Sequence, residues 1–297
     1  MNKSVSHRVP AFPKAKGVWK WQRYLSKVSL ISTSTPILIC AIVPMTTLRS
    51  WRPAFVSAHE LVHHRGNNFT MFGGITLNRQ IGGINPSAVE SSLKLGGKIV
   101  WLPTTSARNH MVKMVHTPDG CVEVVRDGKI VPELKDVFRL VRDFDVILAT
   151  GHISPEECFT VVEAARAESV KKIVVTHPEW WSVGMSLADQ LRLVKDYDVY
   201  LERCFAQNMG NGTYKSNLSG NLEAIQVCGY RNVIISTDGG QVENPNWEIA
   251  LEQYIQYLSD HGIPEDQLYY MTHSIQAALL GLETFPPQSP LESFSTS

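Results

Sequence analysis

The sequence predicts an α/β protein of the (β/α)8 TIM-barrel type, incomplete or distorted at its first strand. From residue 69 onward, short runs rich in Val, Ile and Leu alternate with amphipathic stretches. These runs show little polar alternation, which is typical of strands buried on both faces of a parallel sheet. Repeated strand-then-helix units imply helical crossovers between parallel strands. We find seven strand candidates, whereas a closed barrel needs eight, so a doubly wound open sheet is the alternative.

The strand candidates follow one another at 37–43, 69–78, 98–104, 146–152, 172–177, 198–204 and 232–238. Helices are predicted between them at 52–66, 86–97, 154–168, 186–197 and 245–262. Their first residues carry start signals, such as Ser154 before two glutamates or Pro86 after Asn85. A long connection over 105–131 is predicted to contain a small hairpin that turns at Asp127-Gly128. Connections of this length often lie over an active site.

Composition predicts one large domain with atypical ends. The chain has 297 residues, 43% of them hydrophobic, and a formal net charge of zero, which gives no sign of nucleic-acid binding. We expect a basic, disordered leader over 1–35, a barrel domain over 36–285 and a disordered tail over 286–297.

Location is predicted from the same features. Residues 1–59 contain nine Lys or Arg and no Asp or Glu, so the leader could target an organelle. Five scattered cysteines fit a reducing cytoplasm and argue against a cysteine-based zinc site. The apolar stretch at 29–45 is interrupted by Ser, Thr and Pro36, which makes a stable membrane span unfavourable. A homo-oligomer is compatible with this composition.

Polar side chains stand at the ends of several predicted strands. His152, His177 and Asp238 end three of them, and Glu202 lies near the end of another. Because the carboxyl ends of barrel strands meet at one mouth, these groups are expected to converge. Imidazole and carboxylate are the ligands of catalytic zinc, manganese or iron sites with open positions. Asp238 could be a ligand, the base that takes a proton from water, or both in turn.

Around these residues the chain resembles a known group of proteins, through the segments FGGITLN, GGINPSAVESSLKLGGKIVWLPTTSARNH, ILATGHISPEE, KIVVTHPE and STDGGQ. They are similar to an uncharacterised family of predicted metal-dependent hydrolases in the amidohydrolase-like TIM-barrel superfamily. The resemblance implies a divalent metal, zinc first and manganese or iron as alternatives. It matches His152 and His177 to the superfamily's later histidine ligands and Asp238 to its final Asp.

The leading prediction is therefore metal-dependent hydrolysis of an amide, cyclic amide, lactone or phosphoester in a small molecule. His152 and His177 would hold the metal, with Glu202 as a further ligand, and Asp238 would activate water. Substrate contacts are predicted at the mouth, from Asn78 and Thr104 and from an anion-binding group made of Arg108, Asn109 and His110.

The sequence departs from the superfamily in two places. The His-x-His pair expected after the first strand occurs nowhere in the chain. The last helix has Thr272-His273-Ser274 where relatives tend to carry an Asn-Pro pair. The alternative is thus a catalytically inactive barrel with a binding or structural role.

A competing motif lies upstream. His59-Glu60-Leu61-Val62-His63 is a literal H-E-x-x-H, in which the two histidines could bind zinc on one helical face with Glu60 as general base. The third histidine of the longer zinc-protease motif would fall at Phe69, and the downstream strand–helix alternation is not the layout of such a protease. A zinc peptidase is the less favoured prediction.

Overall fold

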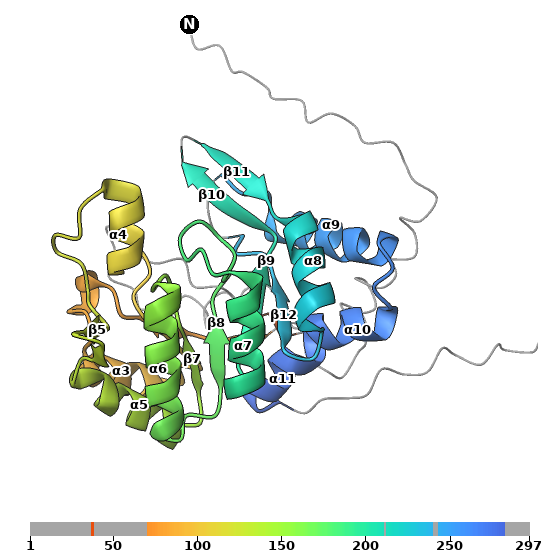
Figure 1. The fold of residues 1–297 in the computed structure, drawn as a ribbon. Coiled ribbons are helices and arrows are strands. Elements are labelled where there is room, and N and C mark those ends of the chain that lie inside the picture. The colour runs from red at the N-terminus through yellow and green to blue at the C-terminus, as the bar shows by residue number, and fades with distance from the viewer. Residues whose placement is uncertain (1–36, 39–69, 211, 240–242, 283–297) are drawn as a thin grey trace, which may run out of the picture.

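A sheet of six parallel strands forms the centre of the protein, in the spatial order β12-β9-β8-β7-β4-β3 (Figure 1). The computed structural model describes residues 37–38, 70–210, 212–239 and 243–282. The strands of this sheet are β3 (Gly74–Thr76), β4 (Ile99–Trp101), β7 (Ile147–Ala149), β8 (Ile173–Val175), β9 (Tyr200–Cys204) and β12 (Val233–Ser236). Each falls inside a predicted strand, and all five pairings are parallel.

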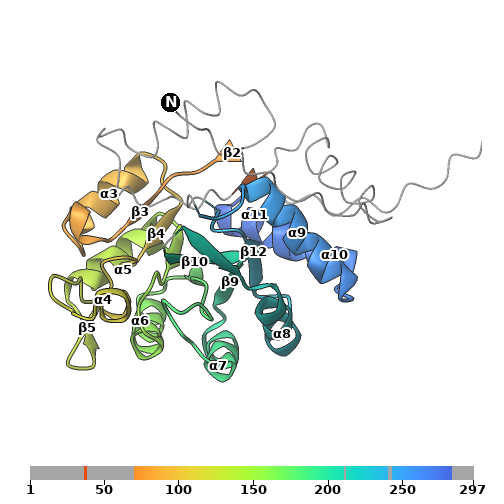
Figure 2. The ribbon, with the colours of Figure 1, turned by 90° about the horizontal axis from the view of Figure 1, so that it is seen from above.

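Helices cover the outer face of this curved sheet (Figure 2). They are α3 (Pro86–Lys94), α5 (Glu133–Asp143), α6 (Pro155–Ala167), α7 (Leu187–Tyr197) and α8 (Leu218–Cys228). The start of α6 shows the predicted cap. The Ser154 hydroxyl accepts from the Glu157 N–H at 3.2 Å, and the Glu157 carboxylate accepts from the Ser154 N–H at 2.8 Å. This reciprocal pair satisfies two N–H groups that the helix itself leaves free.

The strands alternate between two apolar layers. Leu148, Ile173 and Leu201 belong to the core beneath the outer helices. Their neighbours Ile147 and Val174 belong to the core on the inner face. That inner core also contains Ile275, Leu279 and Leu280 from α11 (Ile275–Leu280). Both faces of the sheet are thus buried, which explains why the strand sequences lack polar alternation.

Further elements complete the C-terminal part of the chain. They are α9 (Trp247–Asp260), α10 (Glu265–Tyr269) and a π-helical turn, η2 (Tyr270–Ser274), which leads into α11. Their side chains form a third core with the outer face of β12, in which Tyr254 is fully buried. None of the helices in the described ranges combines the length and apolar character needed to cross a membrane.

Two structures rise above the carboxyl ends of the strands (Figure 1). One is α4 (Arg108–Val115), and the other is the antiparallel hairpin of β10 (Ala206–Gly210) and β11 (Thr213–Ser216). A short turn, η1 (Arg79–Ile81), follows β3. The hairpin predicted at Asp127-Gly128 is confirmed as β5 (Val125–Arg126) and β6 (Lys129–Ile130), with both turn residues at positive φ.

The predicted α/β fold class is confirmed. Within the described ranges, β3 and β12 stand at the two ends of the main sheet. A separate parallel pair joins β1 (Ile37–Leu38) to β2 (Thr70–Met71). The 105–131 connection differs from expectation, because α4 was not predicted in it. The predicted leader and tail, the helix at 52–66 and the H-E-x-x-H motif lie outside the described residues.

Candidate metal centre

The predicted polar residues lie at one edge of the sheet. His152 follows β7, His177 follows β8, Glu202 lies within β9 and Asp238 follows β12. These four strands are consecutive neighbours in the sheet, so the side chains enter the mouth side by side. The structure divides them into a histidine group on the β7–β8 side and a carboxyl group on the β9–β12 side.

Three imidazole rings form a continuous chain of nitrogen contacts. His177 Nε2 lies 3.2 Å from His152 Nε2, and His152 Nδ1 lies 2.8 Å from His110 Nδ1. His110 comes from α4, which lies above the mouth. The ring centroid of His152 lies 4.8 Å from that of His110 and 4.9 Å from that of His177. The hydrogen-bonding contacts between these rings thus run through ring nitrogens.

Burial keeps these imidazoles neutral. Loss of water around His177, which is 2% exposed, is the main reason that its pKa is lowered to about 3, and the nearby His110 contributes in the same direction. Burial and the two neighbouring rings hold the pKa of His152 well below its ordinary value. Burial also lowers the pKa of His110, with Lys113 contributing. Neutral imidazole is the form that binds a metal ion.

Two carboxyl groups make up the other half of the mouth. Burial, with a smaller contribution from the neighbouring Glu202, raises the pKa of Asp238 to about 8. Burial likewise raises the pKa of Glu202 to about 7, although a hydrogen bond with Ser236 partly offsets this. Two carboxylates that share a site cannot both ionise easily, so one of them retains a proton near neutral pH.

Two of the residues at this edge have strained backbone conformations. His177 has φ of 24° and Asp238 has φ of 48°, both in the left-handed region that L-residues rarely occupy. Gly151, next to His152, has φ of 62°, and a Cβ there would lie 2.4 Å from the Leu102 carbonyl oxygen. Residues held in such conformations tend to cluster at functional sites.

The spacing of the His152 and His177 nitrogens fits a shared metal ion. Two nitrogens bound at the usual Zn–N distance in a tetrahedral site lie about 3.3 Å apart, close to the 3.2 Å observed between the Nε2 atoms. His177 Nδ1 is buried and has no hydrogen-bond partner among the residues described. In that same part of the chain, no three His, Cys, Asp or Glu side chains converge as a ready ligand set. The described residues thus supply a two-nitrogen platform rather than a full cage.

The loop after β8 is fastened from above by α4. The Asn109 amide donates to the Ser182 carbonyl at 2.6 Å and to the His152 carbonyl at 3.2 Å. Lys113 Nζ donates to the Val183 carbonyl at 2.8 Å. Within the same loop, the Trp180 ring stacks on His177 with centroids 4.1 Å apart. These contacts fix both histidine-bearing segments relative to α4.

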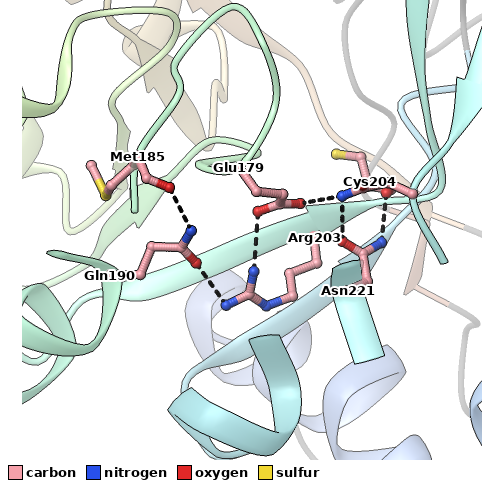
Figure 3. A network of polar contacts seen from close by, with 7 residues as sticks. Glu179, Met185, Gln190, Arg203, Cys204 and Asn221 are labelled. Atoms are coloured by element: carbon pink, nitrogen blue, oxygen red, sulfur yellow. Dashed lines mark hydrogen bonds and ion pairs between the residues drawn. The ribbon is translucent and has the colours of Figure 1, made fainter. Parts of the chain in front are cut away.

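Figure 3 shows a buried polar network around the ion pair of Arg203 and Glu179. Arg203, on the opposite face of β9 from Glu202, is fully buried and donates to Glu179 at 3.0 Å and to Gln190 at 2.9 Å. Glu179 also accepts from Asn217 at 3.1 Å, and Asn217 in turn donates to Asn221 at 3.0 Å. The network joins the loop after β8, strand β9, and helices α7 and α8.

The predicted substrate-binding residues lie in two settings. Asn78 is buried and bonded to Thr104, donating to its hydroxyl and accepting from its N–H, both at 2.9 Å. Arg108 is exposed at the start of α4. The Asn109 amide donates to the His152 carbonyl, and the His110 ring contacts the His152 ring. A role for any of the five in substrate binding stays a prediction.

The contact between His110 and His152 and the network around Arg203 were not predicted from the sequence. Residues 110 and 152 are 42 positions apart, and the helix that carries His110 was not predicted. One signal was present for Arg203, because an arginine inside a strand that is predicted to be buried on both faces needs a buried partner.

The fold of the chain matches that of solved structures. An amidohydrolase from Pseudomonas aeruginosa matches with a TM-score of 0.51 and 13% identity, over 72% of this chain and 74% of that chain. An amidohydrolase from Burkholderia multivorans matches with a TM-score of 0.50 and 8% identity, over 78% and 81%. At these identities the likeness concerns the fold alone. It confirms that the chain has the amidohydrolase-like barrel fold that the resemblance implied.

The family follows from the sequence itself. Residues 43–202 match the family described as "Family of unknown function (DUF6282)". The match covers more than half of the 297 residues, and the chain belongs to this family. A search of curated proteins found no match.

Proposed function

We propose that the protein is a metal-dependent hydrolase that acts on an amide, cyclic amide, lactone or phosphoester bond in a small molecule. The observation that carries this proposal is the pair of neutral Nε2 atoms of His152 and His177 facing each other at 3.2 Å. This spacing suits two ligands of one divalent ion, and imidazole ligands favour zinc, with manganese or iron as alternatives.

The bound ion would supply a Lewis acid that polarises the scissile carbonyl or phosphoryl group. His152 and His177 would hold it from the β7–β8 side, and Glu202 would be a further oxygen ligand from the β9–β12 side. Asp238, in its ionised form, would accept the proton of the water molecule that attacks the substrate. A carboxyl group with a pKa near the working pH is well suited to such a transfer.

A second candidate function rests on one observation. Because no ready set of three ligands converges in the described ranges, an inactive barrel that binds a small molecule or plays a structural role is the alternative. Metal content separates the two candidates directly.

The test uses the full-length protein, stripped with a chelator and then reloaded with Zn²⁺, Mn²⁺ or Fe²⁺. We expect one ion per chain by elemental analysis, and hydrolysis of at least one model amide, lactone or phosphoester. His177→Ala should lose both. His261→Ala is the matched control, because that histidine is exposed and contacts Tyr257 on α9. Substoichiometric metal in the wild type, or normal metal binding by His177→Ala, would contradict the proposal.

The same assay addresses the H-E-x-x-H motif. Replacing Glu60 with Gln removes the general base that a zinc peptidase of this type requires. The barrel proposal expects metal content and hydrolysis to stay at wild-type levels in Glu60→Gln. Loss of hydrolysis with full metal content would favour the peptidase.

A further inference from the structure

We infer that His110 is a positioning residue for His152: it holds the Nδ1 edge of that ring so that the Nε2 lone pair faces His177. The inference rests on the proposed function, since it concerns how the same histidine pair is made ready for a metal ion. The resemblance assigns no such role to His110. The position of this residue is set by α4, which lies outside the sheet.

Geometry is the first support. His110 Nδ1 lies 2.8 Å from His152 Nδ1, shorter than the 3.2 Å between His152 and His177. The planes of the His110 and His152 rings differ by only 23°. A contact of this length between two ring nitrogens is within the range of an N–H···N hydrogen bond.

Proton counting links the direction of that hydrogen bond to metal binding. A neutral imidazole carries one N–H and one lone pair. If His152 donates from Nδ1 to His110, its Nε2 must bear the lone pair, which is the state a metal ligand needs. His110 then carries its own proton on Nε2. If the bond ran the other way, the His152 proton would sit on Nε2 and point at His177, and no ion could bind there.

The hydrogen bonds that hold α4 in place are the second support for this inference. Asn109, the residue beside His110, donates to the backbone carbonyl of His152 itself. It also donates to Ser182, and Lys113 donates to Val183, one turn further along the helix. Helix α4 therefore hydrogen-bonds to the backbone at His152 and in the loop that follows His177. These contacts set the position of the His110 ring against His152.

Outer-shell partners of this kind change metal affinity substantially. Removing a group that fixes the tautomer of a metal-binding histidine typically weakens the metal by about 10- to 100-fold. Asparagine places an amide oxygen close to where histidine places Nδ1, and that oxygen can accept from His152. His110→Asn should therefore retain what His110→Ala loses.

The experiment compares Zn²⁺ affinity in wild type, His110→Ala, His110→Asn and Val112→Ala, by competition with a chromophoric chelator. Val112 lies on the same helix and is 41% exposed, so its truncation controls for changes to α4. We expect His110→Ala to bind about 10- to 100-fold more weakly, and the other two variants to stay within a few-fold of wild type. Thermal melts verify that each variant is folded.

A spectroscopic measurement separates positioning from packing. Long-range proton–nitrogen correlation spectra of ¹⁵N-histidine protein report which ring nitrogen carries the proton, with His152 assigned by its loss in His152→Gln. We expect the zinc-loaded wild type and His110→Asn to show the proton of His152 on Nδ1. Wild-type affinity in His110→Ala, or failure of His110→Asn to recover it, overturns the inference alone. Absence of zinc binding by the wild type overturns the proposed function and the inference with it.

Discussion

Replacing Arg203 with Met tests whether the buried ion pair holds the ends of β8 and β9 together. The change removes the bonds to Glu179 and Gln190 and leaves Glu179 with a side chain only 14% exposed. Breaking one partner of a buried pair costs about 3–5 kcal/mol, because the remaining charge stays desolvated. That is a large share of the total stability of about 5–15 kcal/mol that folded domains have.

Urea unfolding followed by fluorescence measures this cost through the transition midpoint, provided that the slope is unchanged. Burial already raises the pKa of Glu179 although Arg203 opposes it, so the pKa should rise further in Arg203→Met. A carboxyl group with a raised folded-state pKa stabilises the protein at low pH and loses that contribution as pH rises. The deficit of the variant should therefore shrink on acidification.

The double variant Arg203→Met/Glu179→Gln is the control, because it removes both charges while glutamine can still accept from Asn217. It should recover most of the lost stability. A deficit in Arg203→Met below about 1 kcal/mol, the scale of an exposed pair, would refute the reasoning. So would a double variant no more stable than the single one.

Three other substitutions follow from local geometry. Gly151→Ala should unfold the protein or cost several times more than Gly128→Ala in urea, because a Cβ at 151 would lie 2.4 Å from a carbonyl oxygen whereas nothing lies within 4 Å at 128; equal costs would contradict this. Ser154→Ala should cost about 1 kcal/mol through loss of the α6 cap, with Ser154→Thr much closer to wild type in the same melts. The raised pKa of Asp238 makes the metal-free wild type less stable as pH rises toward 8. In the presence of a chelator, Asp238→Asn should therefore melt at a higher temperature than the wild type, and this difference should grow as pH rises toward 8.

The strands were predictable because each is an apolar run buried on both faces. The predicted helices that proved correct begin with a side-chain signal, such as Ser154 for α6 and Ser186 for α7, both of which cap their helices in the structure. By contrast, α4 and α5 begin without a side-chain cap bond, at Ala107 and Pro132. Their first turns therefore lack the local signal on which the helix predictions depended. The hairpin of β10 and β11 was missed because β11 is exposed along its length.

The same distinction applies to the site. Side chains at strand ends could be expected to meet, because parallel strands place their carboxyl ends at one edge. The contacts among these side chains depend on the spacing of the strands and on the conformations of loops, which hydrophobic periodicity does not predict. His152 and His177 come within hydrogen-bonding distance, whereas the ring on the other side of His152 belongs to α4. Likewise Glu202 and Arg203 are adjacent in sequence, yet they face opposite layers.

The energetic state of the mouth bears on whether this barrel is active. His177 is neutral and leaves a buried nitrogen without a partner in the described structure. Asp238 and Glu202 have raised pKa values, and His177 and Asp238 adopt left-handed backbone conformations. Each of these features lowers the stability of the metal-free protein. A barrel with only a structural role would gain stability by replacing them with apolar residues of similar size. Their presence together at one edge supports the proposal that they serve a bound ion and its chemistry, because sites adapted for function commonly sacrifice stability in this way.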